Sequence, residues 1–70
     1  MITVKYPIKV AGLLYPKGSR VRLATLEDMR EIWPGIAPER GSNQIGVWFD
    51  GLALPTIVEK SQLRGLPDEP

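Results

Sequence analysis

The chain has no cysteine, no histidine and no apolar run long enough to cross a membrane in its 70 residues. Without cysteine there is no disulfide framework, and without cysteine or histidine there is no structural zinc site of the usual kinds. The first ten residues alternate polar and apolar side chains, which does not resemble a signal peptide. We therefore expect a soluble cytoplasmic protein with no metal, no cofactor and no membrane partner.

An excess of charge of either sign is also missing. Nine lysine and arginine residues against eight aspartate and glutamate residues give a net charge of +1. A surplus this small does not by itself indicate a nucleic-acid or membrane ligand. The first third of the chain is nevertheless basic, and a short stretch from Glu27 to Glu31 is acidic. We therefore expect one side of the folded domain to be basic.

The residue combinations of common catalytic sites are absent as well. Nucleophilic catalysis needs a base beside the nucleophile, and this chain offers only serine or threonine with lysine, at no recognised spacing. The carboxylates of residues 27–31 suit the start of a helix, and Asp50 before a glycine suits a hairpin turn. The glycines fit no phosphate-binding loop. We expect a protein that is not an enzyme and has no catalytic residues.

What the chain does have is a strand pattern near its start. Apolar side chains at every second position from Ile2 to Val10 predict a half-buried strand, and Pro7 places it at a sheet edge or at a bend. Residues 13–15 can pair back on it as a short strand. The Tyr15–Gly18 segment has proline second and glycine fourth, which predicts a type I turn.

A third strand is predicted over residues 19–24, with Arg20 and Arg22 on its outward side. Thr25 then begins the one expected helix, because its hydroxyl can cap the backbone amide of Asp28. The helix should continue to about Trp33, where Pro34-Gly35 ends it.

The most informative segment is the hairpin predicted over residues 44–58, with a two-residue type I′ turn at Asp50-Gly51. That turn would pair Phe49 with Leu52, Trp48 with Ala53, Val47 with Leu54 and Gly46 with Pro55. Both faces of this hairpin are apolar, so both need a covering. One covering is the core, and the other, over Trp48, must be a helix, a second subunit or a binding partner.

These observations predict a mainly β fold: a small SH3-like barrel of about five short strands with one helix over residues 25–33. A single domain should span residues 1–66, with a 3₁₀ or simple turn near residues 59–63 and a disordered tail over residues 67–70.

The candidate site combines Arg20 and Arg22 with Trp48 and Pro55. Cationic strand positions beside an exposed indole could hold an acidic protein partner, or could neutralise and stack on a nucleic-acid strand. A homodimer pairing its Pro55 edge or its Trp48 face is a third alternative. The fourth is purely structural: the helix and Trp33 cover Trp48, and the arginines keep the outer face of a strand soluble.

Three stretches carry a family resemblance: Gly18 to Leu23 (GSRVRL), Val47 to Gly51 (VWFDG) and Ser61 to Leu63 (SQL). Over about residues 15–66 the chain resembles the small SH3-like accessory subunits of photosynthetic complexes that dock ferredoxin, such as the one in photosystem I and the variable chain of ferredoxin-thioredoxin reductase. The resemblance implies a non-catalytic accessory subunit whose basic side meets an acidic partner. The capped helix replaces an irregular loop of those subunits.

Overall fold

The computed structural model describes residues 1–39 and 41–67. In these residues seven short strands, one α-helix and one 3₁₀-helix follow one another along the chain. They are β1 (Ile2–Val4), β2 (Ile8–Val10), β3 (Leu13–Tyr15), β4 (Arg20–Leu23), α1 (Leu26–Ile32), β5 (Gln44–Phe49), β6 (Thr56–Glu59), η1 (Lys60–Gln62) and β7 (Leu63–Arg64). The predicted disordered tail lies, except for Pro67, outside the described residues.

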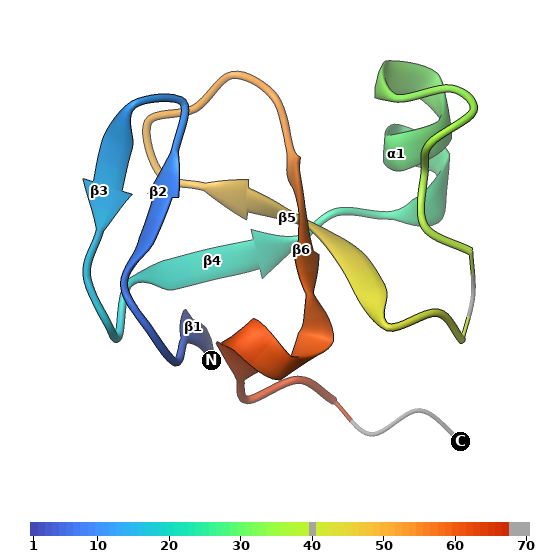
Figure 1. Ribbon diagram of the computed structural model, residues 1–70. Helices are drawn as coiled ribbons and strands as arrows, with labels where there is room; N and C mark the ends of the chain where they lie inside the picture. Colours follow the sequence, from blue (N-terminus) through green and yellow to red (C-terminus); the bar gives the residue numbers. More distant parts are fainter. Residues whose placement is uncertain (40, 68–70) are drawn as a thin grey trace.

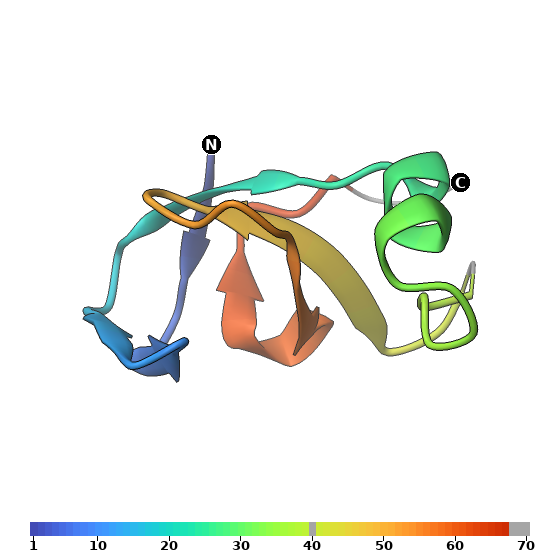
Figure 2. The ribbon, with the colours of Figure 1, turned by 90° about the horizontal axis from the view of Figure 1, so that it is seen from above.

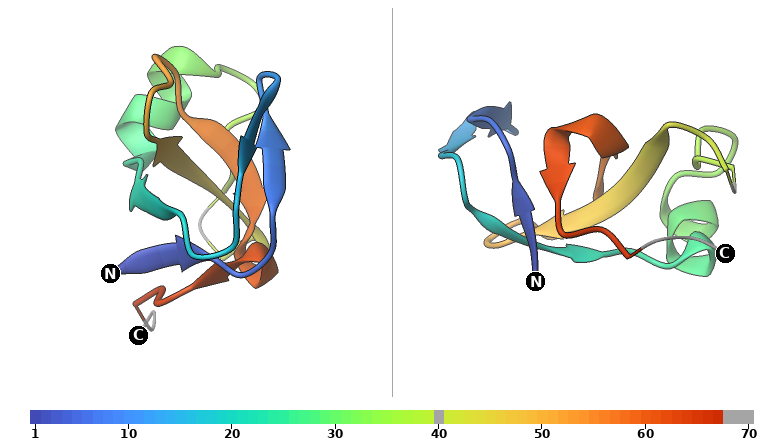
Figure 3. Two further views of the ribbon diagram at one scale, coloured as in Figure 1. Left: turned by 90° about the vertical axis from the view of Figure 1, so that its left-hand side faces the viewer. Right: turned by 90° about the horizontal axis from the view of Figure 1, so that it is seen from below.

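Five of the strands form one antiparallel sheet in the order β6-β5-β4-β1-β7, and β2 and β3 form a separate hairpin. The sheet curls into a half-barrel, with the β2–β3 hairpin at one end of the molecule and α1 at the opposite end (Figures 1 and 2). The right-hand view in Figure 3 shows the same separation, and the left-hand view looks along it from the side of the hairpin. The predicted mainly β, barrel-like fold with one short helix is therefore confirmed.

The strand predicted from Ile2 to Val10 is divided into β1 and β2 by a bend between Val4 and Ile8, and a bend is one of the two placements that Pro7 predicts. Pro7 lies in this bend, where its missing N–H removes no hydrogen bond from a sheet. Because of the bend, β1 belongs to the five-stranded sheet and β2 belongs to the two-stranded sheet. The residues of a single alternating pattern therefore lie in two sheets. The hairpin loop is Ala11-Gly12, and both residues have positive φ angles, of 51° and 81°.

The turn before β4 falls one residue later than predicted. The backbone N–H of Ser19 donates to the carbonyl of Pro16 at 3.1 Å, and Gly18, the third residue of this turn, has a φ of 88°. A positive φ at the third position is typical of a type II turn rather than the predicted type I.

The hairpin of β5 and β6 is confirmed, but its register differs from the predicted one by two residues. Val47 lies opposite Thr56 instead of Leu54, and residues 50–55 form a wider connection. A type I′ turn needs positive φ at both central residues, whereas only Gly51 of the Asp50-Gly51 pair has one. Because the shift is an even number of residues, the side chains of β6 keep their predicted faces.

The core lies on the inner face of the curled sheet. Its buried side chains come from five strands: Val4, Val21, Val47, Phe49, Val58 and Leu63. The Tyr15 ring packs on Phe49 with centroids 4.7 Å apart and planes tilted by 45°. The Tyr15 hydroxyl also donates to the backbone carbonyl of Asp50 at 2.6 Å, which joins the β2–β3 hairpin to the end of β5.

The helix α1 covers part of the opposite, outer face of the sheet. Its start is as predicted, since Thr25 Oγ1 accepts the N–H of Asp28 at 3.0 Å. Met29 is 1% exposed and packs directly against Gly46 of β5, while the Trp33 indole N–H donates to the Pro55 carbonyl at 2.9 Å. The second covering of the hairpin is thus, at Gly46, the protein's own helix.

Gly46→Ala is expected to destabilise the fold by about 1–3 kcal/mol, the usual cost of overpacking. The added methyl group would lie 2.7 Å from Met29 Cε and 2.8 Å from Met29 Cγ, so the Met29 side chain or the helix that carries it would have to move. Urea denaturation of Gly46→Ala and of the double variant Gly46→Ala, Met29→Ala measures this directly. The double variant should be more stable than the sum of the two single changes predicts, and strict additivity would contradict the packing of Met29 on Gly46.

Candidate functional site

The outer face of the sheet carries a row of polar side chains that runs across three strands. Thr3 of β1 lies opposite Arg20 of β4 on one side and opposite Arg64 of β7 on the other. Their chain neighbours Val4, Val21 and Leu63 are buried, so the alternation of a strand turns Thr3 and the two arginines outward. Both arginines are exposed, and Thr3 is half-buried.

Arg22 and Trp48 extend this row toward the next strand. They are direct cross-strand partners in the pairing of β4 with β5. Arg22 is exposed and Trp48 is half-buried. Together with Arg20 they line a shallow hollow of about 250 Å³, whose far wall is the turn Asp50–Leu52. The structure therefore brings together three of the four predicted site residues. We call Thr3, Arg20, Arg22, Trp48 and Arg64 the basic face.

Thr3 and Arg64 are the members of the basic face that sequence reasoning missed, and Arg64 is the charged one. The residue follows a 3₁₀ turn near the end of the chain, and no motif marks it. Only the antiparallel pairing of β7 with β1 brings it next to residues from the start of the chain. The one local signal is weak: Leu63 is apolar, and Arg64 follows it as the outward residue of a two-residue strand.

The chain beyond Pro55 forms a sheet edge, as the sequence predicts, because β6 is the first strand of the five-stranded sheet. Pro55 itself, which the sequence places among the candidate partner-binding residues, precedes β6 and is almost completely buried. The carbonyl of Pro55 accepts the hydrogen bond from Trp33, which fixes it beneath the end of the helix. Pro55 is therefore part of the packing between α1 and the hairpin, and it is not available to a partner.

The two tryptophans have different roles. Trp33 is half-buried, and its indole N–H donates to the hairpin connection at Pro55. Trp48 is also half-buried, yet it shares a hollow with arginines instead of lying fully beneath the helix. The helix contacts the outer face at Gly46, two residues from Trp48, so part of the indole remains accessible.

No carboxylate belongs to β4 or β7, which carry the arginines, or to β1 between them, because β1 reads ITV, β4 reads RVRL and β7 reads LR. Within residues 1–39 and 41–67, the guanidinium groups of Arg20, Arg22 and Arg64 form neither a hydrogen bond nor an ion pair. No described residue therefore forms an ion pair with these three guanidinium groups, and the one carboxylate that lines the same hollow as Arg20 and Arg22 is that of Asp50.

No known protein family, curated protein or solved structure matches this chain.

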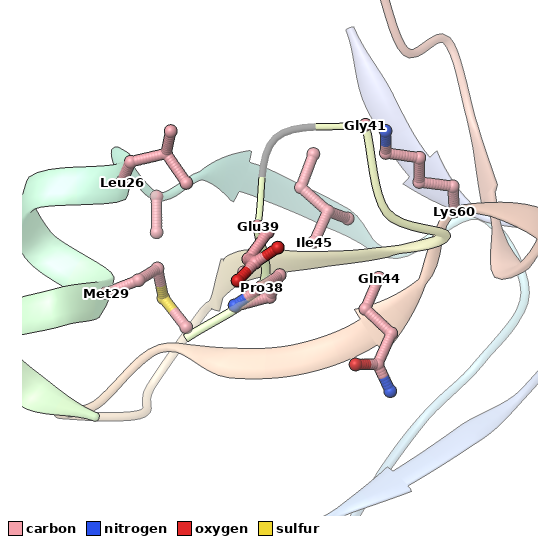
Figure 4. A pocket seen from close by; sticks show the side chains of 10 residues that line it. Leu26, Met29, Pro38, Glu39, Gly41, Gln44, Ile45 and Lys60 are labelled. Atoms are coloured by element: carbon pink, nitrogen blue, oxygen red, sulfur yellow. The ribbon is translucent and has the colours of Figure 1, made fainter. Parts of the chain in front are cut away.

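A second hollow lies at the other end of β5, between α1, the segment before β5 and η1 (Figure 4). It measures about 220 Å³. Its labelled lining residues are Leu26, Met29, Pro38, Glu39, Gly41, Gln44, Ile45 and Lys60. The described lining contains no hydroxyl, thiol or imidazole, and it combines apolar side chains with the polar side chains of Glu39, Gln44 and Lys60.

The described part of the chain shows neither a cluster of metal-ligating side chains nor a helix long and apolar enough to cross a membrane. No group of three or more carboxylate, thiol or imidazole side chains is placed to hold a metal ion in that part. The helices there are also too short to cross a membrane.

Proposed function

We propose that this protein is a small, non-enzymatic interaction module that binds an acidic segment of a partner protein on its basic face. The observation that carries the proposal is the convergence of Arg20, Arg22 and Arg64 with the half-buried Trp48 on one side of the sheet. Arginine is enriched at protein interfaces because its planar guanidinium binds carboxylates through two parallel hydrogen bonds. Tryptophan is enriched there because it buries a large apolar surface.

The arrangement of the charges favours a protein partner over a nucleic acid. Proteins that bind single strands combine an extended basic groove with several aromatic stacking positions. Here the arginines form one compact cluster around β1, and the outward positions of β5 beside Trp48 are Gly46 and Gln44. The cations therefore end at β4 and do not continue onto β5. A compact cluster beside one indole suits a short acidic segment with an adjacent apolar residue.

The proposal predicts saturable binding of a labelled acidic peptide, for example about ten residues rich in aspartate and glutamate with one central leucine. Fluorescence anisotropy of the peptide should give an affinity that falls with added salt, because exposed charges are screened. A dye-labelled single-stranded oligonucleotide of similar charge serves as the comparison. Tighter binding of the oligonucleotide, with the steep salt dependence of counterion release, would favour a nucleic-acid-binding protein instead.

A further inference from the structure

At the centre of the basic face, three side chains are placed so that they can bind one particular anionic group, in addition to attracting negative charge in general. Thr3 stands in the middle of three adjacent strands, with an arginine directly opposite on each side. Neighbouring strands are about 4.8 Å apart, so Arg20 and Arg64 stand roughly 10 Å apart with the threonine hydroxyl between them. Two long flexible cations can therefore converge above one hydroxyl.

The hydrogen-bonding capacity of these three side chains is unused within the described residues. Neither the hydroxyl of Thr3 nor the guanidinium groups of Arg20 and Arg64 bond to another group of that part of the chain. A single carboxylate presents two oxygens and is satisfied by one guanidinium in a bidentate pair. A phosphoryl group presents three strong acceptor oxygens and carries close to two negative charges at neutral pH. Three donors around one point match the phosphoryl group better than the carboxylate.

We propose that Thr3, Arg20 and Arg64 form an oxyanion subsite that takes a phosphorylated serine or threonine side chain of the acidic partner segment. This inference rests on the proposed function, because it names the group that the partner places at the centre of the basic face. Arg22 and Trp48 lie to one side of this subsite and contact the residues that flank the phosphorylated one. Phosphorylation of the partner thus strengthens the complex.

Three labelled peptides that differ only at their central residue test the subsite: one has phosphoserine, one glutamate and one serine. The phosphoserine peptide should bind about tenfold tighter than the glutamate peptide, because it makes additional charge-assisted hydrogen bonds. Arg64→Gln and Thr3→Val should each remove most of this preference, whereas Thr3→Ser, which keeps the hydroxyl, should retain it. Arg22→Gln should weaken the binding of all three peptides by a similar factor.

The outcomes separate the subsite from the proposed function. Equal affinities for the phosphoserine and glutamate peptides would overturn the subsite and leave the acidic interaction module standing. A preference for phosphoserine that survives both Arg64→Gln and Thr3→Val would overturn the assignment to these residues. Failure of all three peptides to bind would overturn both proposals, as would a single-stranded oligonucleotide that binds tighter than the phosphoserine peptide. Circular dichroism of each variant confirms that it is folded.

Discussion

Phe49→Ala is expected to unfold most of the protein under conditions in which Trp48→Ala stays folded, although the two residues are neighbours on β5. Phe49 is 2% exposed and packs on Tyr15 inside the half-barrel, so its removal should cost about 3–5 kcal/mol. A domain of this size has a total stability of only about 4–10 kcal/mol. Trp48 faces outward and is half-buried, and its removal should cost about 1–2 kcal/mol.

Thermal melts followed by circular dichroism compare the two variants. The midpoint should fall by more than about 15 °C for Phe49→Ala and by less than about 10 °C for Trp48→Ala. Trp48→Ala should at the same time lose affinity for the acidic peptide. A Trp48 variant as unstable as the Phe49 variant would show that the indole belongs to the core, and the basic face would lose its aromatic anchor.

The second large effect is expected from reversing charge on β4. The double variant Arg20→Glu, Arg22→Glu places two carboxylates where the acidic segment should dock, and like charges repel across an interface. The affinity for the labelled acidic peptide should fall at least about tenfold at low salt, a change of about 1.4 kcal/mol or more. Because both side chains are exposed, the fold should tolerate the change.

A matched control makes the same change in overall charge at another place. Lys9 of β2 and Arg30 of α1 are also exposed, and neither belongs to the strands or the hollow of the basic face. Lys9→Glu, Arg30→Glu changes the net charge by the same amount, so it reports any general electrostatic attraction. Equal losses of affinity in the two double variants would show that the peptide senses net charge, and the basic face would not be a specific site.

Local sequence signals were sufficient wherever a short pattern decides the structure. The threonine cap of α1, the 3₁₀ turn at Lys60–Gln62 and the two apolar faces of β5 are all as the sequence predicts. These features depend on a few neighbouring residues and on the alternation of side chains in a strand. The mainly β fold with one helix follows from the same signals.

Where the sequence was misleading, a distant contact decided the structure. The Asp50-Gly51 pair predicts a two-residue turn, yet Pro55 is held by the indole of Trp33 and the hairpin pairs two residues later. That bond joins residues 22 positions apart, so no local pattern reveals it. Alternation from Ile2 to Val10 likewise gives no sign that the two halves enter different sheets.

In the candidate site, too, the residues set by local sequence patterns were predicted and those set by distant contacts were not. Arg20, Arg22 and Trp48 follow from alternation in two strands, and the pairing of β4 with β5 brings them together. Arg64 could be predicted as a site residue only from the pairing of β7 with β1. That pairing depends on the complete fold and not on the sequence around Arg64. Hairpin pairing alone predicts an exposed Pro55, whereas its burial depends on the contact with the end of the helix.

The most direct test of the basic face is a two-dimensional ¹H–¹⁵N NMR titration of the intact protein with the unlabelled acidic peptide. The amide signals of Thr3, Arg20, Arg22 and Arg64 and the indole signal of Trp48 should shift together and saturate at one affinity. Signals of the exposed apolar residues Tyr6, Leu13 and Leu14 should stay in place. Shifts confined to those residues, or to the hollow around Met29 and Lys60, would contradict the account.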